Sequence, residues 1–239
     1  MTAALVLGAC PVDSGGAAGG GRDSVTLSGQ VYTRGEIDFG SISELGIKYD
    51  EYQGGDLIIS DGGLGGTGGI KNGKLSYTIG TPAALFPIDM DMIDARGVYA
   101  NISISRSGVS AAPLLLLAED GPVNGALTRE RLSVNSKAGL INFSGETVTY
   151  IYVDNNVTIT AKGDAFTDSY GGIPYSVATQ DIRLNMKKGW NAVNIKLSIN
   201  LTMNLISGAF EPAGIISASL GDSSAFRWTL NSGQELTSF

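Results

Sequence analysis

The fold class of this chain is decided by the stretch Val148-Thr149-Tyr150-Ile151-Tyr152-Val153-Asp154-Asn155-Asn156-Val157-Thr158-Ile159-Thr160-Ala161. Its two flanks consist almost entirely of β-branched and aromatic residues, which are enriched in strands. The three residues between the flanks, Asp154 to Asn156, tolerate the left-handed backbone that tight turns require. The stretch therefore predicts a β-hairpin.

The same alternation of apolar and polar residues recurs along the chain. Strands are expected at 25–32, 57–60, 74–80, 98–104, 192–199, 214–220 and 225–230. Only Asn124 to Leu132 suggests a short helix. Short strands separated by Gly, Asn and Asp predict an all-β fold, an antiparallel β-sandwich of Ig-like or jelly-roll-like type with at most one short helix. We expect one such domain over residues 25–239, with a division near Pro113 as the alternative.

Composition narrows the classes of function. The 239 residues are 43% hydrophobic and 16% charged, with a formal net charge of −7, which indicates a packed acidic globule. An acidic chain without a basic run lacks the charge that binds phosphate backbones, so we expect no nucleic-acid partner. The chain has no histidine and one cysteine. Ser-His-Asp catalysis, Cys-His catalysis, His-ligated metal sites and intramolecular disulfides are therefore excluded.

Two glycine-rich stretches imitate nucleotide-binding motifs. Residues 63–68 match G-x-G-x-x-G, and residues 68–75 come one residue short of a P-loop, with Leu75 in place of the Ser or Thr that binds magnesium. Both motifs need a helix directly after the loop, because the helix N-terminus holds the phosphate. The residues that follow alternate like a strand instead. We therefore expect inter-strand loops, with no nucleotide and no cofactor.

Two further groups of residues are weak site candidates. Asp89, Asp91 and Asp94 form the densest acidic cluster, and an extended segment would direct Asp89 and Asp91 to one side, as a start for calcium ligation. A solvated acidic connector is the alternative. Trp190 follows a basic Lys-Lys-Gly turn and is a candidate for stacking on a sugar or peptide. A core position is the alternative for Trp190 and the expectation for Trp228. No nucleophile motif is present, so no catalytic residue is predicted.

The N-terminal region carries the one motif with an assignable chemical fate. Cys10 follows Leu5-Val6-Leu7-Gly8-Ala9, and Pro11 to Ser24 is rich in Gly, Ala and Ser. A branched apolar residue, two small residues and a cysteine resemble the lipobox of bacterial lipoproteins, in which the cysteine is lipidated and becomes the mature N-terminus. Residues 1–9 are then a truncated signal peptide, because they supply only the end of an apolar h-region. Residues 10–24 are the lipidated Cys10 and a flexible tether.

Together with an all-β domain, this pattern resembles uncharacterised bacterial surface or periplasmic lipoproteins. The resemblance implies a non-catalytic protein of the bacterial cell envelope, anchored by lipid at the outer membrane or cell surface. Its partners would be the membrane, through the anchor, and a glycan or protein ligand for adhesion, binding or assembly. The alternatives are a secreted carbohydrate- or peptide-binding module without lipid and, as a third interpretation, a carboxylate-based hydrolase.

Overall fold

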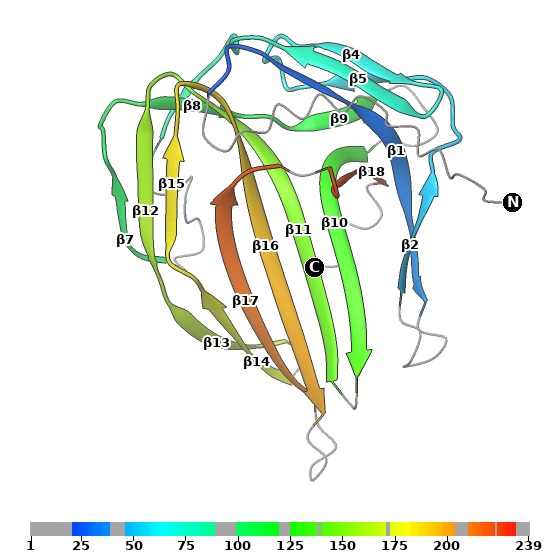
Figure 1. Ribbon diagram of the computed structural model, residues 1–239, viewed down its shortest axis with the longest axis vertical. Helices are drawn as coiled ribbons and strands as arrows, with labels where there is room; N and C mark the ends of the chain where they lie inside the picture. Colours follow the sequence, from blue (N-terminus) through cyan, green and yellow to red (C-terminus); the bar gives the residue numbers. More distant parts are fainter. Residues whose placement is uncertain are drawn as a thin grey trace, which may run out of the picture.

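The computed structural model describes residues 21–38, 46–88, 99–119, 125–137, 140–170, 173–203, 210–222 and 224–232. Within these ranges every regular element is a strand, so the predicted all-β class is confirmed. The strands form a closed barrel, a large sheet that grows out of the barrel, and a small three-stranded sheet (Figure 1). The barrel was not part of the predicted antiparallel sandwich.

Seven strands close the barrel. They follow one another around the ring as β1 (Val25–Asp38), β5 (Lys74–Ile79), β4 (Thr67–Lys71), β3 (Leu57–Ser60), β9 (Leu116–Glu119), β10 (Gly125–Lys137) and β18 (Arg227–Ser232). An odd number of strands that alternate in direction cannot close without one parallel pair. That pair is β1 with β18, where Val31 lies opposite Trp228. A further strand, β2 (Gly46–Glu51), pairs with the distal part of β1 outside the ring.

Alternating side chains fill the barrel. In β5, Leu75, Tyr77 and Ile79 are buried while the residues between them are exposed. Val31 from β1 and Ile70 from β4 are completely buried and lie in the same core. The period-two pattern that predicted the strands therefore also assigns one face of each strand to the barrel interior.

The large sheet continues from β10 as β11 (Leu140–Val153), β16 (Gly189–Met203), β17 (Phe210–Leu220), β14 (Ile173–Thr179) and β13 (Ala165–Tyr170). Its pairs are antiparallel except for β14 with β17, which is parallel. Two short strands, β8 (Ser110–Pro113) and β6 (Phe86–Pro87), extend the edge of β11 near the barrel. Pro113 ends β8, and the chain then enters the barrel at β9. Strand β10 belongs to both the barrel and the large sheet.

The three-stranded sheet forms a second layer over part of the large sheet. It consists of β15 (Ile182–Met186), β12 (Val157–Gly163) and β7 (Tyr99–Ile104). Its apolar side chains meet Val153 and Val193 of the large sheet in a second buried core. Figure 1 shows that β7, β12 and β15 lie beside only the upper part of the long strands β11, β16 and β17.

The predicted hairpin at 148–161 is wrong. β11 and β12 do not pair with each other, because β11 lies in the large sheet and β12 in the second layer. The turn between them is fixed to β8, where Ser110 N donates to Asp154 Oδ1 at 3.0 Å and Asp154 N donates to the Ser110 carbonyl at 3.0 Å. Val153 and Val157 are instead both buried in the second core. Two alternating strands joined by a short turn can pair with each other as a hairpin. They can also lie in two different sheets as an arch, which is the arrangement here.

The suggested helix at Asn124–Leu132 is also wrong, since residues 125–137 are β10. Within that strand, Leu127 pairs with Leu116 of β9 on one side and with Leu230 of β18 on the other. These backbone hydrogen bonds and the burial of Leu127 override a weak local preference for helix.

Candidate functional site

Several predicted site residues lie outside the described part of the chain. They are Cys10, the predicted lipidation site, and the weak calcium candidates Asp89, Asp91 and Asp94. Within the described ranges, no three Cys, Asp or Glu side chains gather in a way that would hold a metal ion. The lipidation and calcium predictions are therefore untested by the geometry.

Trp190 lies in the barrel-side core. Its indole is 3% exposed and meets the Tyr152 ring edge-on, with ring centroids 5.5 Å apart. The indole Nε1 donates a hydrogen bond of 2.8 Å to the Gly80 carbonyl oxygen. A buried ring whose only polar atom is bonded offers no surface to a sugar or peptide, so the ligand-stacking interpretation of Trp190 does not fit its position.

The G-x-G-x-x-G loop is closed on itself. The Asp61 carboxylate accepts hydrogen bonds from the backbone N–H groups of Gly63, Leu64 and Gly66, at 3.1, 3.0 and 2.7 Å. Burial raises the pKa of Asp61, but these hydrogen bonds outweigh burial and hold the pKa below its ordinary value. The backbone N–H groups that would cradle a phosphate are occupied, and strand β4 follows instead of a helix.

A polar cluster lies where the large sheet leaves the barrel. Arg129 Nε donates to both carboxylate oxygens of Asp222, at 2.8 and 2.9 Å, and Tyr150 Oη donates to Asp222 Oδ2 at 2.6 Å. The Arg129 guanidinium lies over the Trp228 ring, which also stacks on Tyr150. Burial and the Asp222 carboxylate raise the pKa of Tyr150, so the phenol stays neutral. These groups bind one another and hold β10, β11 and β18 together.

A hollow of about 490 Å³ lies on the outside of the barrel over β3, β4 and β5. It is lined by Asp56, Leu57, Ile58, Gly68, Gly69, Ile70, Lys71, Lys74 and Ser76. Side chains at the two glycines would collide with backbone, because a Cβ at Gly69 would lie 2.6 Å from the Leu57 carbonyl oxygen. Ile58, at the rim, is 58% exposed. The hollow is a shallow, mixed surface rather than an enclosed site.

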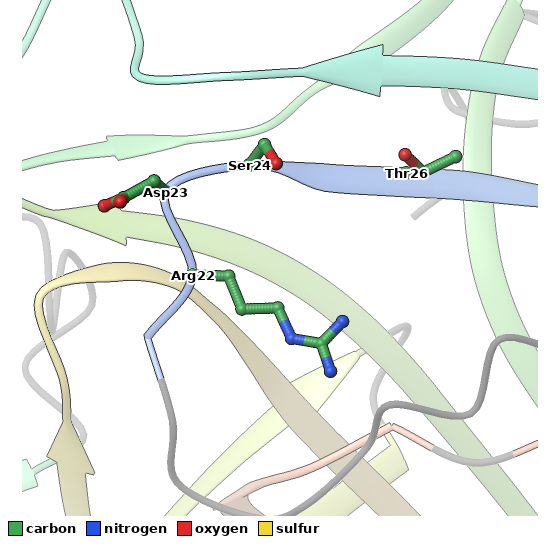
Figure 2. A pocket seen from close by; sticks show the side chains of 4 residues that line it. All are labelled: Arg22, Asp23, Ser24 and Thr26. Carbon is green, nitrogen blue, oxygen red and sulfur yellow. The ribbon is translucent and has the colours of Figure 1, made fainter.

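A second, smaller hollow of about 280 Å³ lies at the start of β1, lined by Arg22, Asp23, Ser24 and Thr26. Figure 2 shows the Arg22 guanidinium pointing away from the Asp23 carboxylate. The segment crosses the large sheet here, where Trp190 N donates to the Arg22 carbonyl at 2.8 Å. Its lining side chains do not converge on a common point, so we assign no ligand to it.

The remaining candidate surface is the half of the large sheet that is remote from the barrel, here called the distal half. It comprises residues 131–137 of β10, 140–146 of β11, 195–203 of β16, 210–217 of β17, and the hairpin β13–β14. In Figure 1 this half extends below the second layer. Strand register divides its side chains between two opposite faces.

The distal polar face carries like residues in register across three strands. Arg131, Glu146 and Lys196 form one row, Ser133, Ser144 and Ser198 the next, and Asn135, Asn142 and Asn200 a third. Arg131 Nη2 and Lys196 Nζ bind Glu146 Oε1, and Asn194 Nδ2 donates to Glu146 Oε2 at 3.2 Å. Burial raises the pKa of Glu146, but the Arg131 hydrogen bond and the other partners outweigh burial and lower it overall. The carboxylate therefore remains charged at neutral pH.

The distal apolar face lies on the other side of the same strands. It consists of Leu132, Val134, Ile141, Phe143, Ile195, Leu197, Ile199, Leu201, Pro212, Ile216, Val177 and Phe166. Neither buried core includes any of these side chains among the described residues. Ile195 is 45% exposed and the others are half-buried. The alternating pattern predicted strands here. It did not predict that the apolar side of these strands continues past the second layer.

Comparison of the chain with protein-family models, with curated proteins and with solved structures gives no match. No helix in the described ranges is long and apolar enough to span a membrane. The geometry of the distal apolar face makes it the candidate functional surface.

Proposed function

We propose that this protein is a non-catalytic, lipid-anchored protein of the bacterial cell envelope, whose β domain serves adhesion, binding or assembly. The observation that supports the binding role is the distal apolar face, which continues the apolar side of four long strands past the second layer. Contiguous apolar surface of this kind marks interaction sites on soluble domains. The face-to-face packing of β12 and β15 on the large sheet is the part of the domain that we propose to be sandwich-like.

A structural role for the carboxylates supports the non-catalytic assignment. Asp61 accepts backbone N–H groups, Glu130 pairs with Arg34, Glu146 pairs with Arg131, and Asp222 pairs with Arg129. A glycosidase needs two carboxylates that face each other across a cleft with room for a sugar and a water. These four carboxylates are engaged with partners that hold strands together.

The anchor rests on Cys10 and on the Gly-rich stretch that follows it. We expect metabolic labelling with palmitate to mark the wild-type protein and not the Cys10→Ala variant, because acylation needs the cysteine. Absence of label on the wild type would contradict the anchor. Cys10→Ala would then be expected to distribute like the wild type between membrane and soluble fractions.

The binding role is tested separately from the anchor. A photo-crosslinking residue at position 197, on the distal apolar face, is expected to give a covalent adduct in cells. The same residue at position 198, on the distal polar face of the same strand, serves as the matched control. Equal crosslinking at both positions, or none at position 197, would contradict a binding role for this face.

A further inference from the structure

The apolar side of β16 continues past the cover that the described residues provide for it. Val193 is 4% exposed and lies in the second core, whereas Ile195, two residues further along the same face, is 45% exposed. The alternation nevertheless continues without a break through Leu197, Ile199 and Leu201. Removing the rest of their apolar surface from water would be favourable. This segment of β16 has the pattern of a strand that is covered on one face.

The distal apolar face is built from apolar side chains that lie in register across neighbouring strands. Val134, Phe143 and Ile199 lie in one row, which continues through Gly214 to Val177 and Phe166. At Gly145 and Gly214 the neighbouring apolar side chains lean over the backbone, since an added Cβ would lie 3.0 Å from Leu132 Cδ2 and 3.3 Å from Val177 Cγ2, respectively. The Arg131–Glu146–Lys196 row lies on the opposite face, and Glu130, at the border, is paired with Arg34.

A surface of this kind matches another sheet. The second layer already packs on the continuation of the same face nearer the barrel, through β12 and β15. A net charge of −7 opposes contact with anionic lipid. The same face of a second copy offers the same rows of Ile, Leu, Val and Phe side chains.

The area is sufficient for a dimer. Six strands about 4.8 Å apart span roughly 29 Å, and seven residues at about 3.3 Å each span roughly 23 Å. The face therefore covers roughly 650 Å² in plan on each copy. Two such faces bury about 1,300 Å², which exceeds the value of about 1,000 Å² that separates specific interfaces from incidental contacts.

We propose that two copies of this chain associate through their distal apolar faces, sheet against sheet about a two-fold axis, with Phe143 and Ile199 near the centre. This proposal rests on the proposed binding and assembly role of that face and names its partner. An isologous contact of this kind closes on itself, so it gives a dimer and not a filament. The distal polar faces, with their Ser and Asn rows, then form the two outer surfaces of the dimer.

The test is sedimentation equilibrium of the purified full chain. We expect the wild type to be dimeric at about 100 µM, a concentration at which even micromolar affinity gives mostly dimer. Ile199→Lys is expected to be monomeric, because each copy would bury an unpaired ammonium. Ser198→Lys adds the same charge to the distal polar face of the same strand and is expected to remain dimeric. Ile199→Ala, which retains the fold more safely, is expected to weaken dimerisation at least about tenfold.

Three outcomes overturn the proposal. One is a monomeric wild type at that concentration, and another is equal dimerisation of Ile199→Lys and Ser198→Lys. The third is a fall in monomer stability for Ile199→Ala as large as that for Val193→Ala, because the face would then be covered by the chain itself. Flotation of a monomeric wild type with phosphatidylcholine vesicles, lost in Ile199→Lys, would assign the face to lipid instead. For a monomeric wild type, a crosslink from position 197 to another protein would instead keep the binding role of this face.

Discussion

Trp190 Nε1 donates a hydrogen bond of 2.8 Å to the carbonyl oxygen of Gly80, although 110 positions separate the two residues in the sequence. The bond joins strand β16 of the large sheet to the residue that follows β5 of the barrel. The Trp190 ring also contacts Tyr152 of β11. One side chain therefore ties the large sheet to the barrel, and its loss is the first of four tests of the architecture.

Trp190→Phe is expected to lower the free energy of unfolding by about 1–2 kcal/mol, because it removes the hydrogen bond while keeping most of the ring. Trp190→Ala removes the packing as well and is expected to cost about 3–5 kcal/mol. Urea unfolding followed by far-UV circular dichroism measures both. Leu115→Ala, which truncates a side chain that is 58% exposed, serves as the control and should have little effect. Equal losses for Trp190→Phe and Leu115→Ala would contradict a linking role.

Gly163→Ala is expected to disturb the point where the chain passes from β12 to β13. A Cβ at this position would lie 1.9 Å from the Thr179 carbonyl oxygen and 2.8 Å from the carbonyl carbon of Gln180, both of them backbone atoms. Backbone must move to make room, at a cost of about 2–3 kcal/mol. Gly55→Ala is the matched control, because nothing lies within 4 Å of its Cβ position. Thermal unfolding midpoints that shift equally for both variants would contradict the close backbone contact at Gly163.

Arg34 and Glu130 form a partly buried ion pair between β1 and β10. Arg34 Nη2 contacts both Glu130 carboxylate oxygens, at 2.9 and 2.8 Å, and Glu130 is only 4% exposed. Arg34→Met leaves the carboxylate without its cation and is expected to cost about 2–3 kcal/mol, less than for a completely buried pair because Arg34 is partly exposed. The double variant Arg34→Met with Glu130→Leu should recover most of that loss. A double-mutant cycle in urea with no coupling between the two sites would contradict the pairing.

Acid is expected to destabilise the fold through Asp61. The folded-state pKa of Asp61 lies below its ordinary value of 3.8, so its contribution to stability is complete above that value. The contribution is then lost as the pH falls below about 4, through the folded pKa. The Asp61→Asn side chain cannot titrate. The urea midpoint of this variant should therefore fall less steeply than that of the wild type between about pH 5 and about pH 2. A slope identical to that of the wild type would show that the loop hydrogen bonds do not favour the charged carboxylate.

The sequence is informative about strands and much less so about how strands pair. Alternation identified the strand character of residues 148–153 and 157–161, because side-chain period is a local property of the chain. It could not decide between a hairpin and an arch, since both leave Val153 and Val157 buried. The contact that decides, between Asp154 and Ser110, joins residues 44 positions apart.

Closure of the barrel could not be predicted from the sequence either, because the contacts that close it are not local. The parallel pairing of Val31 with Trp228 and the dual pairing of β10 involve strands that lie far apart in the chain. At Trp190 the sequence left two interpretations open, because an aromatic residue after a basic turn is compatible with both a surface and a core. The hydrogen bond to Gly80 that fixes the indole in the core has no local signature. Asp61 could have been recognised, since an aspartate before a run of glycines often accepts their N–H groups.

The parallel pair of β1 and β18 has a consequence for the order of events during biosynthesis. Ser28 and Trp228, which are joined through the indole Nε1 at 3.2 Å, lie 200 positions apart. The barrel therefore cannot close before β18, the last of its strands in the sequence, has been synthesised. Such long-range closure makes folding slow and leaves β1 with an unpaired edge until β18 arrives.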